Sequence, residues 1–500
     1  MPDEIFQDFW SSIIAPREDL FFAKDVVIPS LVDEIPDQTF YRNDNINTLT
    51  ISDGVKVIGF DAFSFCYNLK WAKIPASVYE IKEQIFKDCT QLEEICVDPN
   101  NDNYCSIDGV LFRKQPFELL RYPPKKRGHS YVVPDGVERI GNGAFEECSE
   151  LESIELPTSL LAIESSAFSS CSSLKYINIP DSVTRFGAFI LFKCTALTSI
   201  SFPRNLEIIP EGMLFGCTSL RDVEIPTSVN FIEPLSFIEC TNLQRISIPE
   251  NLTKFYSDCF NECNNLERFD VSPNNLSLCE IDGVLYSKDK KTLVRVPPKY
   301  ADECFTVPES VCKINDNAFE SCRNIKTIVL PGHVTNMGVN EIFEDPTAEE
   351  TEAPDNAESS DISVSSESAV IEDAEDFNPP TIPTIFSGCT SLEKIEVAEE
   401  NPLYCSIDGV LCSKDRLQLL YYPQGRKQKQ YSVPDGVTCI GKGAFSNSNE
   451  LEQVELPTSV TCIDNWAFSN CEGLSQIITH SELERISSTA LWNKATLIRK

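Results

Sequence analysis

The feature that most constrains the fold is a set of positions, mostly cysteines, that recur at a fixed spacing. Neighbouring members of this set lie 23 residues apart along most of the chain, as Cys148 and Cys171 do. The thirteen positions, called array positions below, are Asn43, Cys66, Cys89, Cys148, Cys171, Cys194, Cys217, Cys240, Cys263, Cys322, Cys389, Ser448 and Cys471. A period of this length predicts a repeat array rather than separate globular domains.

The same residue types surround each array position. Residues 167–183 follow the pattern A-F-x-x-C-x-x-L-x-x-I-x-I-P-x-S-V. Its L-x-x-I-x-I part alternates between apolar and variable positions, which predicts a short strand with Leu and Ile facing inward. The following Pro ends the strand because it has no N–H to donate, and A-F-x-x-C predicts a helical or turn segment on the opposite side. Neighbouring units must stack, since one unit alone cannot bury its Phe, Leu and Ile.

This frame resembles the BspA-like, or Treponema-type, leucine-rich repeats of bacterial and protist surface proteins, trichomonads included. The resemblance covers roughly residues 26–490 and rests on the period, the I-P-x-S-V step and the A-F-x-x-C step recurring together. It implies an α/β repeat fold, a right-handed leucine-rich-repeat solenoid with parallel strands on the concave face and short helices or turns on the convex side. It also implies a role in adhesion or protein binding, often at a cell surface.

Three intervals in the array measure 59 residues and share one extra module. Each contains a Cys, then I-D-G-V-L, a basic stretch and a proline stop, near residues 98–133, 272–307 and 398–433. Because Asp-Gly is a strong turn dipeptide, the flanking segments Val110–Phe112 and Leu119–Tyr122 predict a strand pair. We expect a β-hairpin that widens the repeat, either as structural decoration or as a dedicated binding element.

The chain divides into five segments on these patterns. Residues 1–25 are expected to be an N-terminal cap, 26–343 and 382–490 the repeat array, and 491–500 a C-terminal cap. Residues 344–381 form an acidic loop, with 13 acidic side chains and no Lys or Arg between Glu344 and Asp376. Such a segment cannot bury enough apolar area to offset ordering entropy, which predicts disorder. Its serines are open to phosphorylation, or the loop is simply solvated.

The charge balance excludes some partners. The chain has 77 acidic and 42 basic residues, a net charge of -35, so its field repels nucleic acid and anionic lipid. The charge either keeps the chain soluble or steers a basic protein partner. Asp3 and Glu4 stand where a signal peptide needs positive charge, and no apolar run reaches membrane-span length. The sequence as written predicts a cytoplasmic monomer without membrane insertion, whereas the family resemblance favours the cell surface or secretion.

The sequence predicts neither an active site nor a cofactor or metal site. His129, His333 and His480 lie at unrelated phases of the repeat, and no nucleotide-binding or metalloprotease motif occurs. The 21 cysteines lack the tight C-x-x-C pairs of structural zinc. Parallel strands about 4.8 Å apart hold equivalent Cβ atoms farther apart than the roughly 3.8 Å a disulfide needs. We therefore expect a buried ladder of free thiols that fill space as small apolar groups, and a reducing or anaerobic environment.

The register also predicts a binding face. Side chains four, five and seven residues after each array position should point outward from the strands. Aromatic and Arg side chains dominate protein-binding hot spots. The candidate partner-binding residues are Trp71, Lys73, Tyr176, Arg221, Glu224, Arg245 and Arg268. Trp71 and Tyr176 either contact a partner or cover the neighbouring strands of their own sheet. The sequence favours a non-catalytic binding or adhesion module, with an intracellular scaffold or regulator as the alternative and a hydrolase or ligase last.

Overall fold

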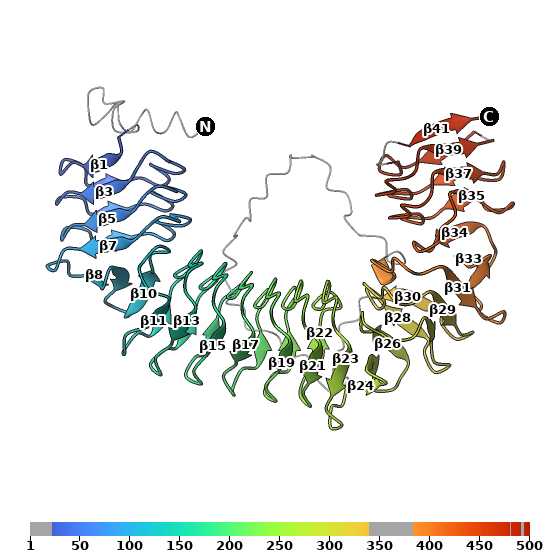
Figure 1. The fold of residues 1–500 in the computed structure, drawn as a ribbon, viewed down its shortest axis with the longest axis horizontal. Coiled ribbons are helices and arrows are strands. Elements are labelled where there is room, and N and C mark those ends of the chain that lie inside the picture. Colours follow the sequence, from blue (N-terminus) through green and yellow to red (C-terminus); the bar gives the residue numbers. More distant parts are fainter. Residues whose placement is uncertain (1–22, 340–383, 481, 492–494) are drawn as a thin grey trace, which may run out of the picture. The chain divides into compact units, whose positions relative to one another are not determined.

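The computed structural model describes residues 23–339, 384–480, 482–491 and 495–500. The predicted acidic loop and nearly all of the predicted N-terminal cap lie outside these residues. The described chain forms two compact units. Figure 1 labels their strands and colours them in the order of the sequence. Unit 1 holds the described residues up to Asn275 together with Asp282–Val284 and Pro297–Lys299, and unit 2 holds the remainder. Each unit is built from the same stacked repeat.

One row of strands, called the first row, comes from the L-x-x-I-x-I segments. These strands pair in parallel with a 23-residue register, so that Asp25 lies opposite Thr48 and Thr48 opposite Trp71. In unit 1 the first row contains β1 (Asp25–Ile28), β3 (Thr48–Ile51), β5 (Trp71–Ile74), β7 (Glu94–Val97), β11 (Ser130–Val132), β13 (Ser153–Glu155), β15 (Tyr176–Asn178), β17 (Ser199–Ser201), β19 (Asp222–Glu224), β21 (Arg245–Ile248) and β23 (Arg268–Val271). In unit 2 it contains β27 (Cys304–Thr306), β29 (Thr327–Leu330), β31 (Lys394–Val397), β35 (Gln430–Ser432), β37 (Gln453–Leu456), β39 (Gln476–Thr479) and β41 (Thr496–Arg499).

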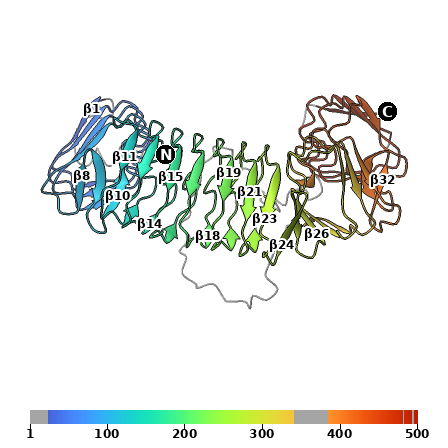
Figure 2. The same cartoon turned by 60° about the horizontal axis from the view of Figure 1, so that its bottom comes forward.

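A second row of shorter strands follows the proline step of each repeat. Figure 2 shows β14 and β18 of this row apart from β15 and β19 of the first row. The strands from unit 1 are β2 (Glu34–Ile35), β4 (Val57–Ile58), β6 (Glu80–Ile81), β12 (Arg139–Ile140), β14 (Ala162–Ile163), β16 (Arg185–Phe186), β18 (Ile208–Ile209), β20 (Phe231–Ile232) and β22 (Lys254–Phe255). The strands from unit 2 are β28 (Lys313–Asn315), β30 (Asn336–Val339), β36 (Cys439–Ile440), β38 (Cys462–Ile463) and β40 (Arg485–Ile486). Each repeat therefore contributes to two parallel sheets.

The extra modules are three-stranded antiparallel meanders that feed into the second row. In the first module β8 (Tyr104–Ile107) pairs with β9 (Val110–Arg113), and β9 pairs with β10 (Glu118–Arg121), the strand pair expected from the sequence. β10 then pairs in parallel with β12. The other two modules contain β24 (Leu278–Ile281), β25 (Val284–Ser287) and β26 (Thr292–Arg295), and β32 (Tyr404–Ile407), β33 (Val410–Ser413) and β34 (Gln418–Tyr421).

Each module brings one more first-row strand than the cysteine spacing revealed. Ser130 of β11 lies opposite Ser153 of β13, again 23 residues apart, although the array position of its repeat is Lys125. The 59-residue interval is thus one full repeat plus a meander. At the tip of the first meander, Asp108 and Gly109 both have positive φ, 50° and 76°, as a two-residue type I′ turn requires.

The expected short helices are not found among the described residues, where only Thr384 and Ile385 are helical. The A-F-x-x-C segments are turns instead. The residue before the array position takes a left-handed conformation, with φ of 60° at Phe65 and 55° at Lys193, which an α-helix does not accommodate. The amides of these turns bond to the next repeat, as Phe63 N–H does to the Ile85 carbonyl at 3.1 Å. The α part of the predicted α/β class is therefore wrong, and the array is all β and turn.

The core of each unit is a set of ladders that run across the repeats. Phe40 stacks on Phe63 with ring centroids 5.3 Å apart, and Phe445 on Phe468 at 5.0 Å. Beside the rings lie the array cysteines, which are fully buried and free of disulfides. Their thiols do more than fill space, because most donate a hydrogen bond to a carbonyl 26 residues earlier, as Cys194 does to Phe168 at 3.1 Å.

Candidate functional site

The outward face of the first row carries the side chains predicted to bind a partner. Trp71 and Lys73 lie in β5 on either side of buried Ala72, and Tyr176 in β15 precedes buried Ile177. The same alternation exposes Glu224 in β19, Arg245 in β21 and Arg268 in β23, and Arg221 is exposed just before β19. The register deduced from the array positions therefore places six of the seven side chains on this face, and the seventh, Arg221, is exposed directly before it.

The seven residues fall into three separate sheets. Trp71 lies between Thr48 and Glu94 in the sheet β1-β3-β5-β7, and no strand of that sheet pairs with β15. Tyr176 lies between Ser153 and Ser199 in the sheet β11-β13-β15-β17. Glu224, Arg245 and Arg268 belong to the sheet β19-β21-β23, where Arg245 lies opposite Arg268, and Arg221 directly precedes β19. Direct strand pairing thus brings together only this last group.

Some of the charges on the outward face are paired within the chain. Arg245 pairs with Asp222 at 3.1 Å, and Arg268 pairs with Asp270. Lys175, next to Tyr176, reaches Glu152 on the preceding repeat at 2.5 Å, and this hydrogen bond lowers the pKa of Glu152. Exposed pairs of this kind contribute little to stability, because solvent screens them. Because they remove net charge locally, the aromatic side chains are the larger potential source of binding energy on this face.

The sequence reasoning missed exposed positions on this face in each first-row strand that follows a meander, namely Ser130 and Val132, Cys304 and Thr306, and Gln430 and Ser432. Ser130 and Val132 of β11 are both exposed, and 62% of Val132 is accessible. They belong to the repeat whose array position is Lys125, so a search based on cysteine could not find them. The 23-residue offset between residues 130 and 153 was the available signal.

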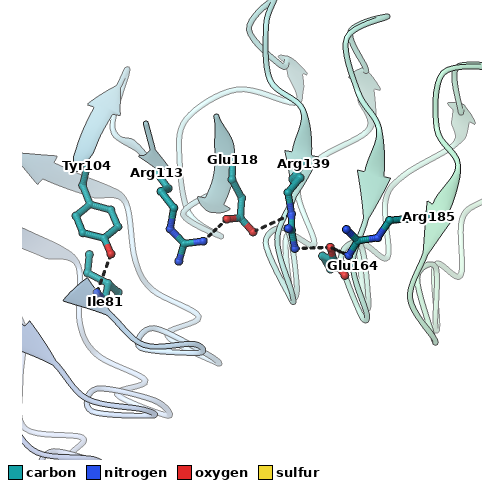
Figure 3. Close-up of polar contacts among 7 residues, drawn as sticks. All are labelled: Ile81, Tyr104, Arg113, Glu118, Arg139, Glu164 and Arg185. Carbon is teal, nitrogen blue, oxygen red and sulfur yellow. Dashed lines mark hydrogen bonds and ion pairs between the residues drawn. The ribbon is translucent and has the colours of Figure 1, made fainter. Parts of the chain in front are cut away.

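A ladder of alternating charges crosses the second row of unit 1 (Figure 3). Arg113 of β9 contacts Glu118 of β10 at 2.5 Å, and Arg139 of β12 bonds Glu164 at 2.6 Å while lying 3.8 Å from Glu118. Arg185 of β16 contacts Glu164 at 3.2 Å. Burial raises the pKa of Glu118, although Arg113 and Arg139 act in the opposite direction. The ladder connects four strands through side chains and holds its carboxylates between guanidinium groups.

A different set of groups occupies the corresponding place in unit 2. Cys439 of β36 lies opposite Cys462 of β38, which lies opposite Arg485 of β40. The two thiols and the Asp464 carboxylate offer three ligand atoms that all lie within 4.8 Å of one another. Burial is the main cause that raises the pKa of Cys439. This group could hold a metal ion, which the search for C-x-x-C pairs missed because its cysteines are one full repeat apart.

Within the described part of the chain, no helix has the length and hydropathy of a membrane span. Among the same residues, the His480 Nε2 contacts a Glu455 carboxylate oxygen at 2.8 Å, and this hydrogen bond lowers the pKa of Glu455. His129 contacts a backbone carbonyl, that of Glu150, at 3.0 Å. Both histidines thus have contacts that account for their positions on the surface.

Comparison with known proteins points to one family. The family described as "BspA type Leucine rich repeat region (6 copies)" matches residues 22–127, 125–242, 190–280, 302–372 and 421–499. These matches cover well over half of the chain. No curated protein matches the chain.

The chain is also similar to solved structures of bacterial proteins. A leucine-rich cell surface protein from Faecalibacterium prausnitzii is 24% identical over 91% of each chain, with a TM-score of 0.44. A leucine-rich-repeat protein from Eubacterium ventriosum is 25% identical over 51% of this chain and 80% of its own, with a TM-score of 0.43. A leucine-rich-repeat protein from Bacteroides ovatus is 18% identical over 91% of this chain and 92% of its own, with a TM-score of 0.36.

Proposed function

The chain belongs to the BspA-type leucine-rich-repeat family, and from that premise we propose that it is a non-catalytic module that presents the outward face of its first row to a protein partner. The proposal takes the array as a right-handed coil with this face on the concave side. Repeat folds of this kind offer extended surfaces because each repeat contacts only its neighbours and adds one strip of side chains.

The observation that carries the proposal is the exposed aromatic and Arg content of this face. Tyr176 is 48% accessible, and Trp71 is half-buried on the same face of its own sheet. Arg221 has no side-chain partner among the described residues, in contrast to the paired Arg245. A Tyr or Trp that is already held by flanking strands loses little conformational entropy on binding. These residues are the proposed anchor points in unit 1.

A partner-capture experiment tests this face. The variant Trp71→Ala, Tyr176→Ala, Arg221→Ala, Arg245→Ala is expected to lose at least ten-fold in affinity for a partner captured by the wild-type chain. A matched control carries Tyr79→Ala and Arg204→Ala, because Tyr79 is 55% accessible just before β6 and Arg204 is exposed in a turn. Equal capture by the two variants, with unchanged circular dichroism, would rule out the proposed face.

Two cellular locations are candidates for where the protein acts. The family favours adhesion at a cell surface, whereas the 21 free cysteines favour an intracellular scaffold or regulator in a reducing compartment. Surface labelling of intact cells with an impermeant reagent, read against a cytosolic marker, distinguishes the two. Labelling at the level of the marker supports the intracellular scaffold, and labelling well above it supports adhesion.

A further inference from the structure

The second row of unit 2 brings two thiols and one carboxylate together. Cys439 and Cys462 are paired residues on the adjacent parallel strands β36 and β38, so their side chains leave the same face of the sheet. Asp464 follows β38 and contacts both of them. Its Oδ2 lies 3.7 Å from the Cys439 Sγ, and its Oδ1 lies 3.9 Å from the Cys462 Sγ. All three residues are half-buried, which leaves a path for a small ion.

These separations are close to those of a tetrahedral site. A Zn²⁺ ion binds sulfur at about 2.3 Å and a carboxylate oxygen at about 2.1 Å, which sets the distance between neighbouring sulfur and oxygen ligands at about 3.6 Å. Each Asp464 oxygen lies within a few tenths of an ångström of that distance from a different one of the two sulfurs, and one ligand atom from each of the three residues lies within 4.8 Å of the others. Three protein ligands leave the fourth position open, as in catalytic zinc sites.

Unit 1 provides an internal comparison, because residues 101–190 and 401–490 follow the same pattern with an offset of 300. The counterparts of Cys439, Asp464 and Arg485 are Arg139, Glu164 and Arg185. In unit 1 the Arg139 guanidinium supplies a fixed positive charge 2.6 Å from Glu164, as Figure 3 shows. In unit 2 that guanidinium is replaced by a thiol, and Cys462 supplies a second thiol where unit 1 has Ala162.

The neighbouring residue also differs between the two units, in a way that matches the loss of the Arg139 charge. Glu118, the buried carboxylate on the other side of Arg139, is replaced by the neutral Gln418 in unit 2. A carboxylate, two soft ligands and a neutral amide thus stand where unit 1 alternates charges. Where unit 1 has the positively charged Arg139, unit 2 has thiol ligands, and thiolates prefer soft metal cations.

We propose that Cys439, Cys462 and Asp464 bind one thiophilic divalent cation of the Zn²⁺ class. Binding releases the two thiol protons to solvent, since thiolates are the metal ligands. Two thiolates, one carboxylate and a divalent ion carry a net charge of about -1, and the adjacent Arg485 balances it. The remaining coordination position takes water or a ligand atom from a partner.

Arg485 is a positioning residue for this site. Its Nη2 donates to the Cys462 Sγ at 2.9 Å and to the Asp464 Oδ1 at 2.7 Å, and its Nε donates to the same sulfur at 3.3 Å. The guanidinium therefore fixes the orientation of two of the three ligands before an ion binds. Groups that orient ligands in this way typically change metal affinity 10- to 100-fold when they are removed.

The array cysteines do not offer a comparable site. They are fully buried, and thiols such as Cys171 and Cys471 already donate to backbone carbonyls, at 3.1 Å and 2.9 Å. Among the described residues, none of them belongs to a group of three ligand atoms as close together as those of Cys439, Cys462 and Asp464. The proposed site is thus specific to the second row of unit 2 and is independent of the protein-binding face.

Titration of the full chain with Co²⁺ and Zn²⁺ tests the site. The chain is purified under reducing conditions, treated with a chelator and titrated with Co²⁺, which gives a sulfur-to-cobalt charge-transfer band when thiolates bind it. One equivalent per chain is expected, and Zn²⁺ should displace it. Cys439→Ser and Cys462→Ser should abolish the band, and Asp464→Asn should weaken binding at least ten-fold. Cys304→Ser, which removes an exposed thiol elsewhere in unit 2, should leave binding unchanged.

A second measurement separates loss of the site from loss of the fold. Zn²⁺ should protect Cys439 and Cys462 of the wild-type chain from alkylation by iodoacetamide, with the modified residues mapped by mass spectrometry, while Cys304 stays reactive. The metal-free Cys439→Ser chain should keep the wild-type circular dichroism spectrum. Absence of the charge-transfer band in the wild-type chain, or equal protection of Cys304, would overturn the proposal.

Discussion

The Cys171 thiol donates a hydrogen bond to the Phe145 carbonyl on the preceding repeat, with Sγ and O 3.1 Å apart. The same contact recurs along both units, so the array cysteines connect one turn of the coil to the next. Ser448 is an exception among the array positions. Its side chain is buried, and its hydroxyl has no hydrogen-bond partner among the described residues.

Replacing Ser448 with Cys should therefore stabilise the protein. The longer, less polar side chain fills more of the buried space, and its thiol can reach the Tyr422 carbonyl in the way that Cys148 reaches Tyr122, at 3.8 Å. A gain of about 1 kcal/mol is expected from burial of an apolar atom and relief of an unpaired hydroxyl. The measurement is the urea midpoint of Ser448→Cys under reducing conditions. Ser446→Cys, in a half-buried position of the same turn, should give no gain; an unchanged midpoint at 448 would contradict the argument.

The buried thiols make folding stability sensitive to alkaline pH. Burial raises the pKa of eight array thiols from an ordinary value of 9.0, namely those of Cys148, Cys171, Cys194, Cys217, Cys240, Cys322, Cys389 and Cys471, the last to about 12. The folded chain keeps these protons while the unfolded chain loses them above pH 9. Stability is thus fully present below pH 9 and falls as pH rises, by about 1.4 kcal/mol per pH unit for each thiol.

Urea midpoints at pH 8, 9 and 10 under reducing conditions measure this slope. The double variant Cys171→Ala, Cys194→Ala should be less stable at pH 8, because it leaves cavities and removes two hydrogen bonds. Its slope above pH 9 should be shallower than that of the wild type by about 3 kcal/mol per pH unit. If the stability of the two proteins fell with pH at the same rate, the thiols would not control alkaline unfolding.

Arg295 and Glu320 form a buried ion pair whose two members should depend on each other. The guanidinium contacts the Glu320 carboxylate at 2.5 Å and donates to the Asn317 carbonyl at 2.6 Å, and both side chains are almost fully buried. Arg295→Tyr alone leaves a buried carboxylate without its cation and should cost about 3–5 kcal/mol.

The third module supplies the compensating change for this pair. At the equivalent positions it has Tyr421 and Ser446. The double variant Arg295→Tyr, Glu320→Ser should recover most of the loss, and a double-mutant cycle from chemical denaturation measures the coupling. Additive effects of the two substitutions would contradict the expected coupling.

The turn at the tip of the third meander should tolerate no side chain at Gly409. Its φ is +77°, and a Cβ there would lie 2.6 Å from the Lys394 Cβ. Gly436 has a similar φ, +92°, but a Cβ there meets nothing within 4 Å. Gly436→Ala should cost about 1 kcal/mol for its backbone conformation, and Gly409→Ala should cost clearly more because the chain must also shift. Thermal denaturation measures the stability of both variants. Equal losses of stability would mean that the structure relieves the contact with Lys394 at no cost.

Much of the architecture could be predicted from the sequence, because the 23-residue period determines which residues share a register. Ile177 and Tyr176 illustrate this, since the alternation of L-x-x-I-x-I placed one inside and the other outside. For the A-F-x-x-C segments the sequence left helix and turn open, and it did not predict the backbone conformation of the turns. Non-glycine residues such as Phe65 and Lys193 adopt positive φ there. Phe and Lys have no intrinsic preference for positive φ, so their residue types do not predict this conformation. Their conformation is imposed by hydrogen bonds to the next repeat.

The two candidate sites differ in how much of each could be predicted from the sequence. The outward residues follow from the strand register alone, whereas their binding role depends on a partner that the sequence does not specify. The group at Cys439 and Cys462 combines residues that are adjacent only after neighbouring repeats stack. The sequence shows that the two cysteines occupy the same position in successive repeats. The contribution of Asp464, in contrast, depends on the path of the chain after β38.

The 23-residue register also limits which insertions and deletions the gene could accept. Duplication or loss of one whole repeat leaves every strand, turn and thiol opposite an equivalent partner, so the array can change length by full periods. Loss of a single residue within a repeat such as 167–189 would instead turn inward side chains outward on that strand. Length variation among related chains should therefore occur in whole repeats or as complete meanders, with fractional changes confined to the tips of turns.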